Sequence, residues 1–345
     1  MSVRKEIGVG VIGLGFMGRT HVAAYEAARR EGYPCRLVAV CDRSPERRAG
    51  RLGSEGTRGL AREESLFDPR SISAYAEVEE ILADPAVELL SICTYTDTHA
   101  DLAIRALEAG RHALVEKPLA RTSAEARRVR LASEAARGLC MPAMCMRFWP
   151  GWSWLREQVR TGALGAVRSA TFTRVGSRPG WSGEFYADFE RSGGALLDLH
   201  VHDADFVRWC FGPPEEVVSC GSLRHVTTIY RYASGPEHVV AEGGWSEAPG
   251  APFRMRYRVE FERATAEFDL ASRATLTLHN AAGTQEVPLP AGDGYDGQIR
   301  HLVERIAAGR RDLLATPAEA EAVLRLIEAE HKSLERGVPV RVRSA

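Results

Sequence analysis

A glycine pattern near the start of the chain constrains its fold more than any other feature. The pattern G-x-G-x-x-G spans residues 13–18, follows the apolar run 7–12 and precedes an alanine-rich segment over 20–30. The three glycines permit a sharp turn, a close approach of backbone to a pyrophosphate, and packing of a helix on the strand. The first N–H groups of that helix attract phosphate. We therefore expect a dinucleotide-binding turn whose cofactor contacts are Gly13, Gly15, Phe16, Met17 and Gly18.

An acidic residue follows at the position such a turn requires. Asp42 ends the apolar run 36–41 and lies 24 residues after Gly18, close to the roughly 20 expected. A carboxylate there accepts hydrogen bonds from the ribose 2′-hydroxyl and repels a 2′-phosphate, which favours NAD. Arginines 43, 47 and 48 either pair with a 2′-phosphate or form the solvated face of the next helix. We expect NAD, with NADP as the alternative, and place Asp42 and Arg43 among the cofactor contacts.

Apolar strands alternate with helical segments through the rest of the first half. The sequence predicts helices over 77–82, 100–109 and 123–136, and strands over 89–93, 112–115 and 139–146. This alternation predicts a parallel, doubly wound sheet, which binds ligands outside the carboxyl ends of its strands. The turns after two of these strands therefore supply further expected cofactor contacts, which are Thr94, Tyr95, Thr96, His99, Glu116 and Lys117.

The chain is long enough for two domains, and its composition is that of a globular protein. Of its 345 residues 45% are hydrophobic and 26% are charged, and its net charge of −1 argues against a nucleic-acid-binding surface. Seven cysteines without a C-x-x-C pair indicate reduced thiols. No apolar run approaches the ~20 residues of a membrane span, and no signal peptide is recognisable, so we expect a cytoplasmic protein.

The pattern changes after residue 148. We expect a Rossmann domain over 1–148 and a second domain over 149–345. Helices are predicted over 152–160, 295–308 and 317–336. Period-two alternation predicts an α+β domain with a large, mostly antiparallel, open-faced sheet. Its expected strands are 167–175, 217–220, 226–232, 239–245, 253–261, 266–270, 274–278, 284–287 and 338–342.

An apolar segment over 192–209 carries several polar residues that need partners or a function. Read as one helix, it places Asp198 and His202 four residues apart on one face, with Asp205 near that face. A structurally satisfied, buried histidine is the alternative for His202.

A metal site is the rival interpretation of this segment. Asp198, His200, His202 and Asp203 are all of metal-ligating type. A helix advances about 100° per residue, which turns His200 roughly 200° away from Asp198. We therefore expect no metal, whereas an extended His-x-His strand would favour one.

Three motifs in this order resemble those of the Gfo/Idh/MocA family. They are G-x-G-x-x-G over 13–18, C-T-x-T-x-x-H over 93–99 and E-K-P over 116–118. The family comprises glucose–fructose oxidoreductases, inositol dehydrogenases and relatives, with NAD(P) on a Rossmann domain and a sugar or cyclitol on a sheet-based second domain. Its pattern G-G-x-x-x-D-x-G-x-H-x-x-D matches residues 193–205, except that His200 replaces a glycine. Tyr95 replaces the usual proline, and the resemblance implies a cis Lys117–Pro118 bond.

The resemblance implies hydride transfer between nicotinamide and a secondary alcohol of a sugar, sugar derivative or cyclitol. It assigns His202 as the base, Lys117 as the hydrogen-bond donor to the reacting oxygen, and Asp198 as a substrate ligand. The alternatives are an NAD-dependent glycoside hydrolase or lyase and a non-catalytic NAD(P)-binding regulator. Relatives form homodimers or homotetramers through the open sheet face. The expected substrate contacts are Arg147, Trp181, His200 and Tyr295.

Overall fold

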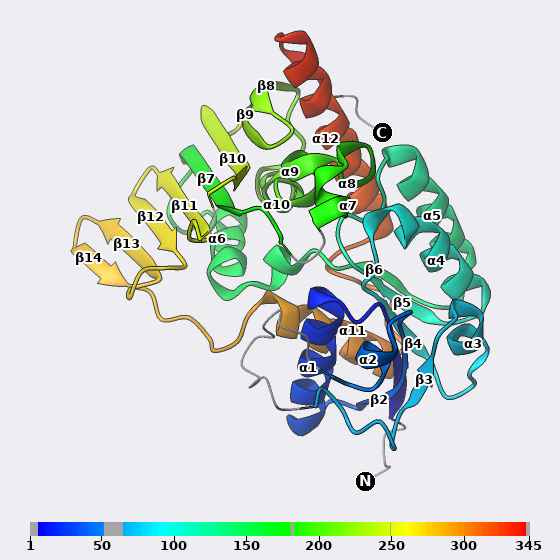
Figure 1. Ribbon diagram of the computed structural model, residues 1–345. Helices are drawn as coiled ribbons and strands as arrows, with labels where there is room; N and C mark the ends of the chain where they lie inside the picture. Colours follow the sequence, from blue (N-terminus) through cyan, green and yellow to red (C-terminus); the bar gives the residue numbers. More distant parts are fainter. Residues whose placement is uncertain (1–5, 52–64, 181–182, 249, 343–345) are drawn as a thin grey trace. The chain divides into compact units, whose positions relative to one another are not determined.

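The computed structural model describes residues 6–51, 65–180, 183–248 and 250–342. These residues form two compact units (Figure 1). The first unit comprises Met1–Ala120, Ala124–Cys145 and Asp293–Glu321, and the second comprises Arg121–Ser123, Met146–Gly292 and Ala322–Ala345.

This division differs from the expected single boundary at residue 148. The segment 293–321 belongs to the first unit, where helix α11 (Gly294–Ala307) packs on helix α1 (Phe16–Arg30). The apolar side chains of Ile299 and Leu302 on α11 are fully buried. Because α11 is buried in the first unit, residues 293–321 belong to that unit, and no single boundary in the sequence separates the two units.

The first unit contains the predicted doubly wound parallel sheet. Its six strands lie in the order β3-β2-β1-β4-β5-β6, and every neighbouring pair is parallel. Strand β1 is buried along its whole length, as an apolar run covered on both faces must be. The strands are β1 (Ile7–Ile12), β2 (Cys35–Cys41), β3 (Ser73–Tyr75), β4 (Leu89–Ile92), β5 (His112–Val115) and β6 (Cys140–Pro142). The remaining helices are α2 (Pro45–Arg48), α3 (Val78–Ala83), α4 (Thr96–Glu108) and α5 (Ser123–Ala135).

The second unit contains the predicted large sheet. Its nine strands lie in the order β14-β13-β12-β11-β7-β10-β9-β8-β15. Strands β7 and β10 are parallel, and the other neighbouring pairs are antiparallel. The strands are β7 (Val167–Ser177), β8 (Glu216–Ser222), β9 (His225–Arg231), β10 (His238–Ser246), β11 (Arg254–Phe261), β12 (Ala264–Asp269), β13 (Leu276–Asn280), β14 (Gly283–Glu286) and β15 (Val340–Arg341).

One face of this sheet carries the core of the second unit. Trp152 lies on α6 (Pro150–Thr161), where its ring packs edge-on against Phe206 and Tyr257 at centroid separations of 4.7 and 5.5 Å. Along β11, buried and exposed residues alternate strictly, so one face packs on the core and the other is polar and open.

The segment 192–209 is not the single helix that we expected. It forms the end of α8 (Phe189–Ser192), then α9 (Gly194–Asp198) and α10 (Val201–Phe211). The chain turns at Leu199 and His200, where the amides of both residues donate to the carbonyl of Ala195. Asp198 therefore ends one helix, and His202 lies in the first turn of the next. A short helix α7 (Gly183–Ala187) and a 3-10 turn (Cys145–Phe148) complete the described elements, together with α12 (Pro317–Arg336).

Two further observations bear on the sequence predictions. All seven cysteines lie in the described residues and none of them forms a disulfide; six are buried, whereas Cys220 is exposed. Within the described residues, no helix is both long enough and apolar enough to cross a membrane.

Candidate active site

The glycine turn between β1 and α1 is built as the motif predicts. Gly13 has φ +85°, and a side chain there would meet the carbonyl oxygen of Cys93 at 2.6 Å. A Cβ on Gly18 would collide with the carbonyl of Gly13. Two of the glycines are therefore required by the turn and by the close contact of helix and strand.

Gly15 has a different reason to lack a side chain. A Cβ at this position would project into open space, with no atom within 4 Å. Gly15 is also the N-cap of α1 and has no side chain with which to cap that helix. Bare backbone at the N-terminus and the positive end of a helix dipole suit a pyrophosphate. The turn thus fits the dinucleotide that its sequence predicts.

Asp42 ties this turn to the end of β2. One carboxylate oxygen accepts a hydrogen bond from the amide of Leu14 at 2.7 Å, and the other accepts one from the amide of Ser44 at 2.8 Å. The Arg48 guanidinium donates to the backbone carbonyls of Asp42 and Arg43 at 2.7 and 3.0 Å. The Asp42 carboxylate therefore holds the glycine turn and retains further lone pairs for a ribose hydroxyl.

The loop after β4 is joined to the turn after β5 through His99. Its Nδ1 lies 2.8 Å from the carbonyl oxygen of Pro118, and its Nε2 lies 3.1 Å from that of Thr94. Burial lowers the pKa of His99, and the two carbonyls offset that effect only in part. His99 is 1% exposed, and its two contacts connect the loop after β4 with the turn after β5. Tyr95, in contrast, is 47% exposed.

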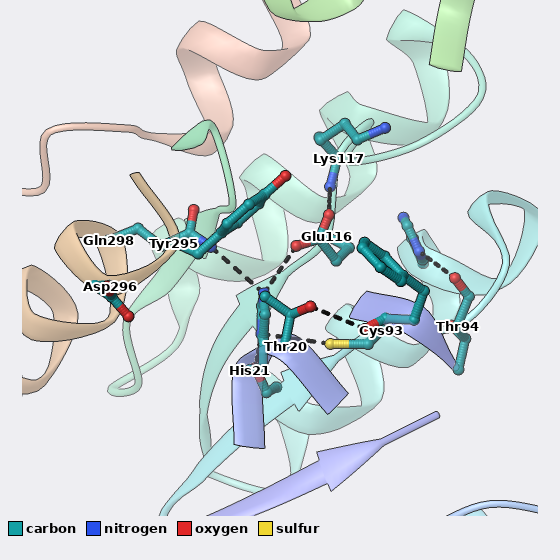
Figure 2. A network of polar contacts seen from close by, with 12 residues as sticks. Thr20, His21, Cys93, Thr94, Glu116, Lys117, Tyr295, Asp296 and Gln298 are labelled. Carbon is teal, nitrogen blue, oxygen red and sulfur yellow. Dashed lines mark hydrogen bonds and ion pairs between the residues drawn. The ribbon is translucent and has the colours of Figure 1, made fainter. Parts of the chain in front are cut away.

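The turn after β5 holds the Glu116-Lys117-Pro118 motif, and its Lys117–Pro118 bond is cis, as the resemblance implied. Glu116 is 4% exposed and lies beside the fully buried His21 of α1 (Figure 2). The Oε1 atom of Glu116 is 2.9 Å from Nε2 of His21. The other oxygen, Oε2, accepts a hydrogen bond from the Lys117 amide at 3.1 Å. The two carboxylate oxygens therefore have separate partners.

Three more groups surround the His21 ring. Its Nδ1 lies 2.6 Å from the Ser91 hydroxyl and 3.4 Å from the Cys93 sulfur, and the Gln298 amide nitrogen lies 3.4 Å from Nε2. Burial by itself would lower the pKa of His21, but the Cys93 sulfur and the Glu116 carboxylate outweigh it and raise that pKa to about 10.

The Glu116 carboxyl behaves in the complementary way. Burial would raise the pKa of Glu116, but the hydrogen bond and charge of His21, with Lys117 nearby, lower it. Glu116 and His21 therefore form a buried ion pair at neutral pH.

Lys117 and Tyr295 border this network in the first unit. The Lys117 side chain is half-buried and extends away from the His21–Glu116 pair (Figure 2). Tyr295 is half-buried in the first turn of α11, where its amide donates to the N-cap residue Asp293 at 2.7 Å. The catalytic role of Lys117 and the substrate contact of Tyr295 therefore stay predictions.

His202 and Asp198 lie in the second unit, on either side of the turn between α9 and α10. The His202 side chain is 8% exposed, and Asp198 is half-buried. Trp181, a further expected substrate contact, lies outside the described residues.

His200 and Asp203 each contact different partners, whereas the ligands of a metal site would share one ion. The Nε2 atom of His200 lies 3.0 Å from Oε2 of Glu330 on α12 and 3.1 Å from the Tyr230 hydroxyl. Asp203 forms a buried ion pair with Arg174, with N–O distances of 2.7 and 3.1 Å. His200 is fully buried, so we propose that it anchors the turn before α10 rather than contacting substrate.

Arg147 is also buried, in a two-point ion pair with Asp205 of α10. Its Nη2 and Nε atoms lie 2.6 and 3.0 Å from the two carboxylate oxygens. Both side chains are 1% exposed, and the guanidinium lies over the Trp209 ring at 5.5 Å from its centroid. We therefore propose a structural role for Arg147 in place of the expected substrate contact.

Removing one partner of this pair is expected to be costly. The Arg147→Ala variant leaves the Asp205 charge buried without its cation, and we expect the free energy of unfolding to fall by about 3–5 kcal/mol. Urea unfolding followed by tryptophan fluorescence measures the change. The double variant Arg147→Met with Asp205→Leu removes both charges and is expected to recover most of the loss. A loss in Arg147→Ala of less than about 1 kcal/mol, as for an exposed pair, would contradict this role.

Four residues of this network were not predicted as site residues, namely His21, Ser91, Cys93 and Gln298. A signal for His21 is present in the sequence, because Gly18, His21, Tyr25 and Ala28 recur at helical spacing and all are buried. A histidine on that face needs a buried partner. Its partner Glu116 lies 95 residues away, and no local pattern connects the two.

Two models of one family match the chain. The first, described as "Oxidoreductase family, NAD-binding Rossmann fold", matches residues 7–143. The second, the GFO/IDH/MocA C-terminal domain, matches residues 152–281. The two matched segments coincide with the parallel sheet and with most of the large antiparallel sheet.

Curated relatives and solved structures agree with these matches. Levoglucosan dehydrogenase of Pseudarthrobacter phenanthrenivorans is 31% identical over 60% of this chain, a match that spans 52% of that protein. An uncharacterised oxidoreductase of Synechocystis is 27% identical over 64% of this chain and 55% of its own length. The chain thus matches about half the length of each of these two relatives. Inositol 2-dehydrogenase of Rhizobium meliloti is 27% identical over 92% of this chain and 96% of that protein.

A solved structure of levoglucosan dehydrogenase, in complex with NADH and L-sorbose, has the same fold. It superposes with a TM-score of 0.83 at 23% identity and covers 99% of this chain and 100% of that chain. The chain therefore belongs to the Gfo/Idh/MocA oxidoreductase family, with the family's NAD-binding Rossmann fold in its first unit and the family's C-terminal domain in its second.

Proposed function

We propose that the protein oxidises a secondary alcohol of a sugar, sugar derivative or cyclitol and catalyses the reverse reduction. The observation that carries this proposal is the Glu116–Lys117 turn. It lies at the carboxyl end of β5, in the same unit as the phosphate-binding turn, and a buried network fixes it. The named relatives act on levoglucosan and inositol, which are both polyhydroxylated. NAD, when bound, supplies the hydride acceptor for such an alcohol.

Lys117 is proposed to donate a hydrogen bond to the alcohol oxygen. An ammonium group favours the negative charge that develops on this oxygen as its proton leaves. The Glu116 carboxylate and the His21 imidazolium beside it carry opposite charges. Their charges largely cancel, so Lys117 supplies the net positive charge at this turn.

His202 is proposed to take the hydroxyl proton. A histidine changes its protonation near neutral pH, which suits a group that accepts a proton in one direction and returns it in the other. Asp198, at the end of α9, is proposed to bind a neighbouring hydroxyl and orient the substrate. A carboxylate accepts hydrogen bonds from hydroxyl groups, as a polyol ligand requires.

For the cofactor itself we propose a preference for NAD over NADP. The Asp42 carboxylate remains at the end of β2, where it disfavours a 2′-phosphate. The Arg48 guanidinium donates to backbone carbonyls, which removes one of the three arginines that argued for NADP. Arg43 is exposed and stays a candidate cofactor contact.

A panel of sugars and inositols with NAD and with NADP tests the proposal. We expect reduced cofactor to accumulate with at least one polyol, and faster with NAD. A second candidate is glycoside cleavage through transient oxidation, in which sugar is released and no reduced cofactor accumulates. Silence across the panel, with NADH still bound, would favour a non-catalytic regulator. Either of these last two results would contradict the proposed dehydrogenase.

We also propose a cytoplasmic homodimer or homotetramer assembled through the open sheet face. On this face Arg258 lies 3.1 Å from Glu267 and 3.6 Å from Glu260, so charges of both signs alternate. Charges of both signs on one face allow two copies related by a two-fold axis to pair unlike charges. Light scattering should give a dimer or tetramer mass, which the Arg258→Glu variant is expected to lower. A monomeric wild-type protein would contradict the assembly.

A further inference from the structure

The buried His21–Glu116 pair adjoins Lys117 in the chain, but neither of its two side chains has a direct part in the proposed reaction. Glu116 divides its two carboxylate oxygens between His21 Nε2, at 2.9 Å, and the Lys117 amide, at 3.1 Å. A carboxylate on a flexible side chain has no intrinsic reason to keep this orientation. The contact with His21 supplies one, because rotation of the carboxylate would break a charge-assisted hydrogen bond.

His21 has further neighbours at its ring nitrogens besides Glu116. The Ser91 hydroxyl of β4 lies 2.6 Å from Nδ1, and the Gln298 amide of α11 approaches Nε2 at 3.4 Å. The ring is 0% exposed, as is Gln298. The Ser91 hydroxyl of strand β4 thus holds one nitrogen of a ring on helix α1, and the other nitrogen of that ring holds Glu116 (Figure 2).

We propose that His21 is a positioning residue for the reaction. It holds one oxygen of Glu116, keeps the other oxygen on the Lys117 amide, and so fixes the point from which the lysine side chain extends. This inference rests on the proposed role of Lys117. Because His21 is fully buried, it acts on the reaction only through Glu116 and touches neither cofactor nor substrate.

A misplaced catalytic group costs turnover far more than it costs ligand binding. A displacement of about 1 Å lowers rates by up to about a hundredfold when a reacting group must be aligned. A purely structural role for His21 would instead lower the thermal stability and leave the kcat of the folded enzyme unchanged. A fall in kcat with little change in the Kd for NADH therefore indicates a positioning role, whereas a fall in thermal stability with unchanged kcat indicates a structural one.

Two substitutions of His21 divide its contacts. The His21→Asn variant keeps an amide nitrogen near the place of Nδ1 and loses the contact with Glu116. The His21→Gln variant places its amide nitrogen near Nε2 and keeps that contact without the charge. We expect kcat to fall about ten- to hundredfold in His21→Asn, with the Kd for NADH changed less than about twofold. In His21→Gln we expect kcat to return to within about threefold of wild type.

Two further variants make the result decisive. Val129→Ala removes buried apolar volume from α5 of the same unit and should lower thermal stability with kcat unchanged. Lys117→Ala tests the underlying function separately. If Lys117→Ala keeps turnover, the role proposed for Lys117 fails. If Lys117→Ala loses turnover while His21→Asn stays within threefold of wild type, only the positioning role fails.

Equal losses of kcat in His21→Asn and His21→Gln would also overturn the inference, since the Glu116 contact would then be irrelevant. Should His21→Asn not fold, Glu116→Asp replaces it. The shortened carboxylate keeps its charge but cannot reach both partners, so kcat should fall by a similar factor, and an unchanged kcat would overturn the proposal. Nitrogen NMR of the wild-type histidine rings gives a further check. Nε2 of His21 should carry a proton at pH 8, and an unprotonated Nε2 would contradict the hydrogen bond to Glu116 that the proposal uses.

Discussion

The Lys117→Ala variant is expected to lose turnover by about 100-fold or more while it still binds NADH. The variant removes the ammonium group that we propose favours negative charge on the reacting oxygen, a charge that develops as the hydroxyl proton leaves. The glycine turn and Asp42, which we expect to hold the cofactor, are left intact. Steady-state kinetics with an active polyol measure kcat, and NADH fluorescence measures the dissociation constant.

The chain offers a matched control for this loss. Lys332 on α12 is exposed, and Lys332→Ala removes an ammonium group from a residue that has no proposed role in the reaction. Its kcat should stay within about twofold of wild type, as for most exposed substitutions. Turnover in Lys117→Ala within tenfold of wild type would remove Lys117 from the mechanism.

The His202→Ala variant is expected to lose turnover by a similar factor of about 100 or more. The variant removes the proposed base, and general-base catalysis contributes about 10²–10⁴-fold. Because a small cavity replaces the ring, added imidazole should restore part of the activity in a concentration-dependent way. Initial rates with and without imidazole measure the rescue.

His238 on β10 supplies the control for His202. It is an exposed histidine in the same unit, and His238→Ala should retain kcat within about twofold of wild type. Normal turnover in His202→Ala would support the structural alternative, a buried histidine with no part in proton transfer.

Elements with a strong local pattern could be predicted from the sequence. The glycine turn, the strand ending at Asp42 and the E-K-P turn each combine a periodic apolar run with turn residues, so type and position follow from local physics. The same holds for β11, whose alternation of buried and exposed residues matches the period of a strand. Predicted strand and helix ends differ from the observed ones by a few residues, because end residues lack the full set of periodic neighbours.

Features that depend on distant partners could not be predicted. The segment 192–209 has a helical pattern throughout, yet it turns at Leu199 and His200. His200 packs against Gly243, where an added Cβ would lie 2.7 Å from the Cβ of His200. The His200 ring also pairs with Glu330. Neither partner is near it in sequence, so periodicity alone favoured one continuous helix.

The same limitation applies to the candidate site. Arg147 lies in a stretch of aromatic and turn residues, whereas its buried partner Asp205 lies 58 positions later. Likewise, His21 gains its role from Glu116, and α11 gains its place in the first unit from α1. Long-range pairing of polar groups decides these assignments, and it leaves little trace in local sequence.

Isotope transfer tests the central claim most directly. The wild-type enzyme is incubated with NAD and an active polyol that carries deuterium on the carbon to be oxidised, and the reduced cofactor is analysed by mass spectrometry. Net dehydrogenation predicts one deuterium in each molecule of reduced cofactor, and one ketone formed for each. Reduced cofactor that lacks deuterium, or ketone that forms without labelled reduced cofactor, would contradict hydride transfer as the reaction of this protein.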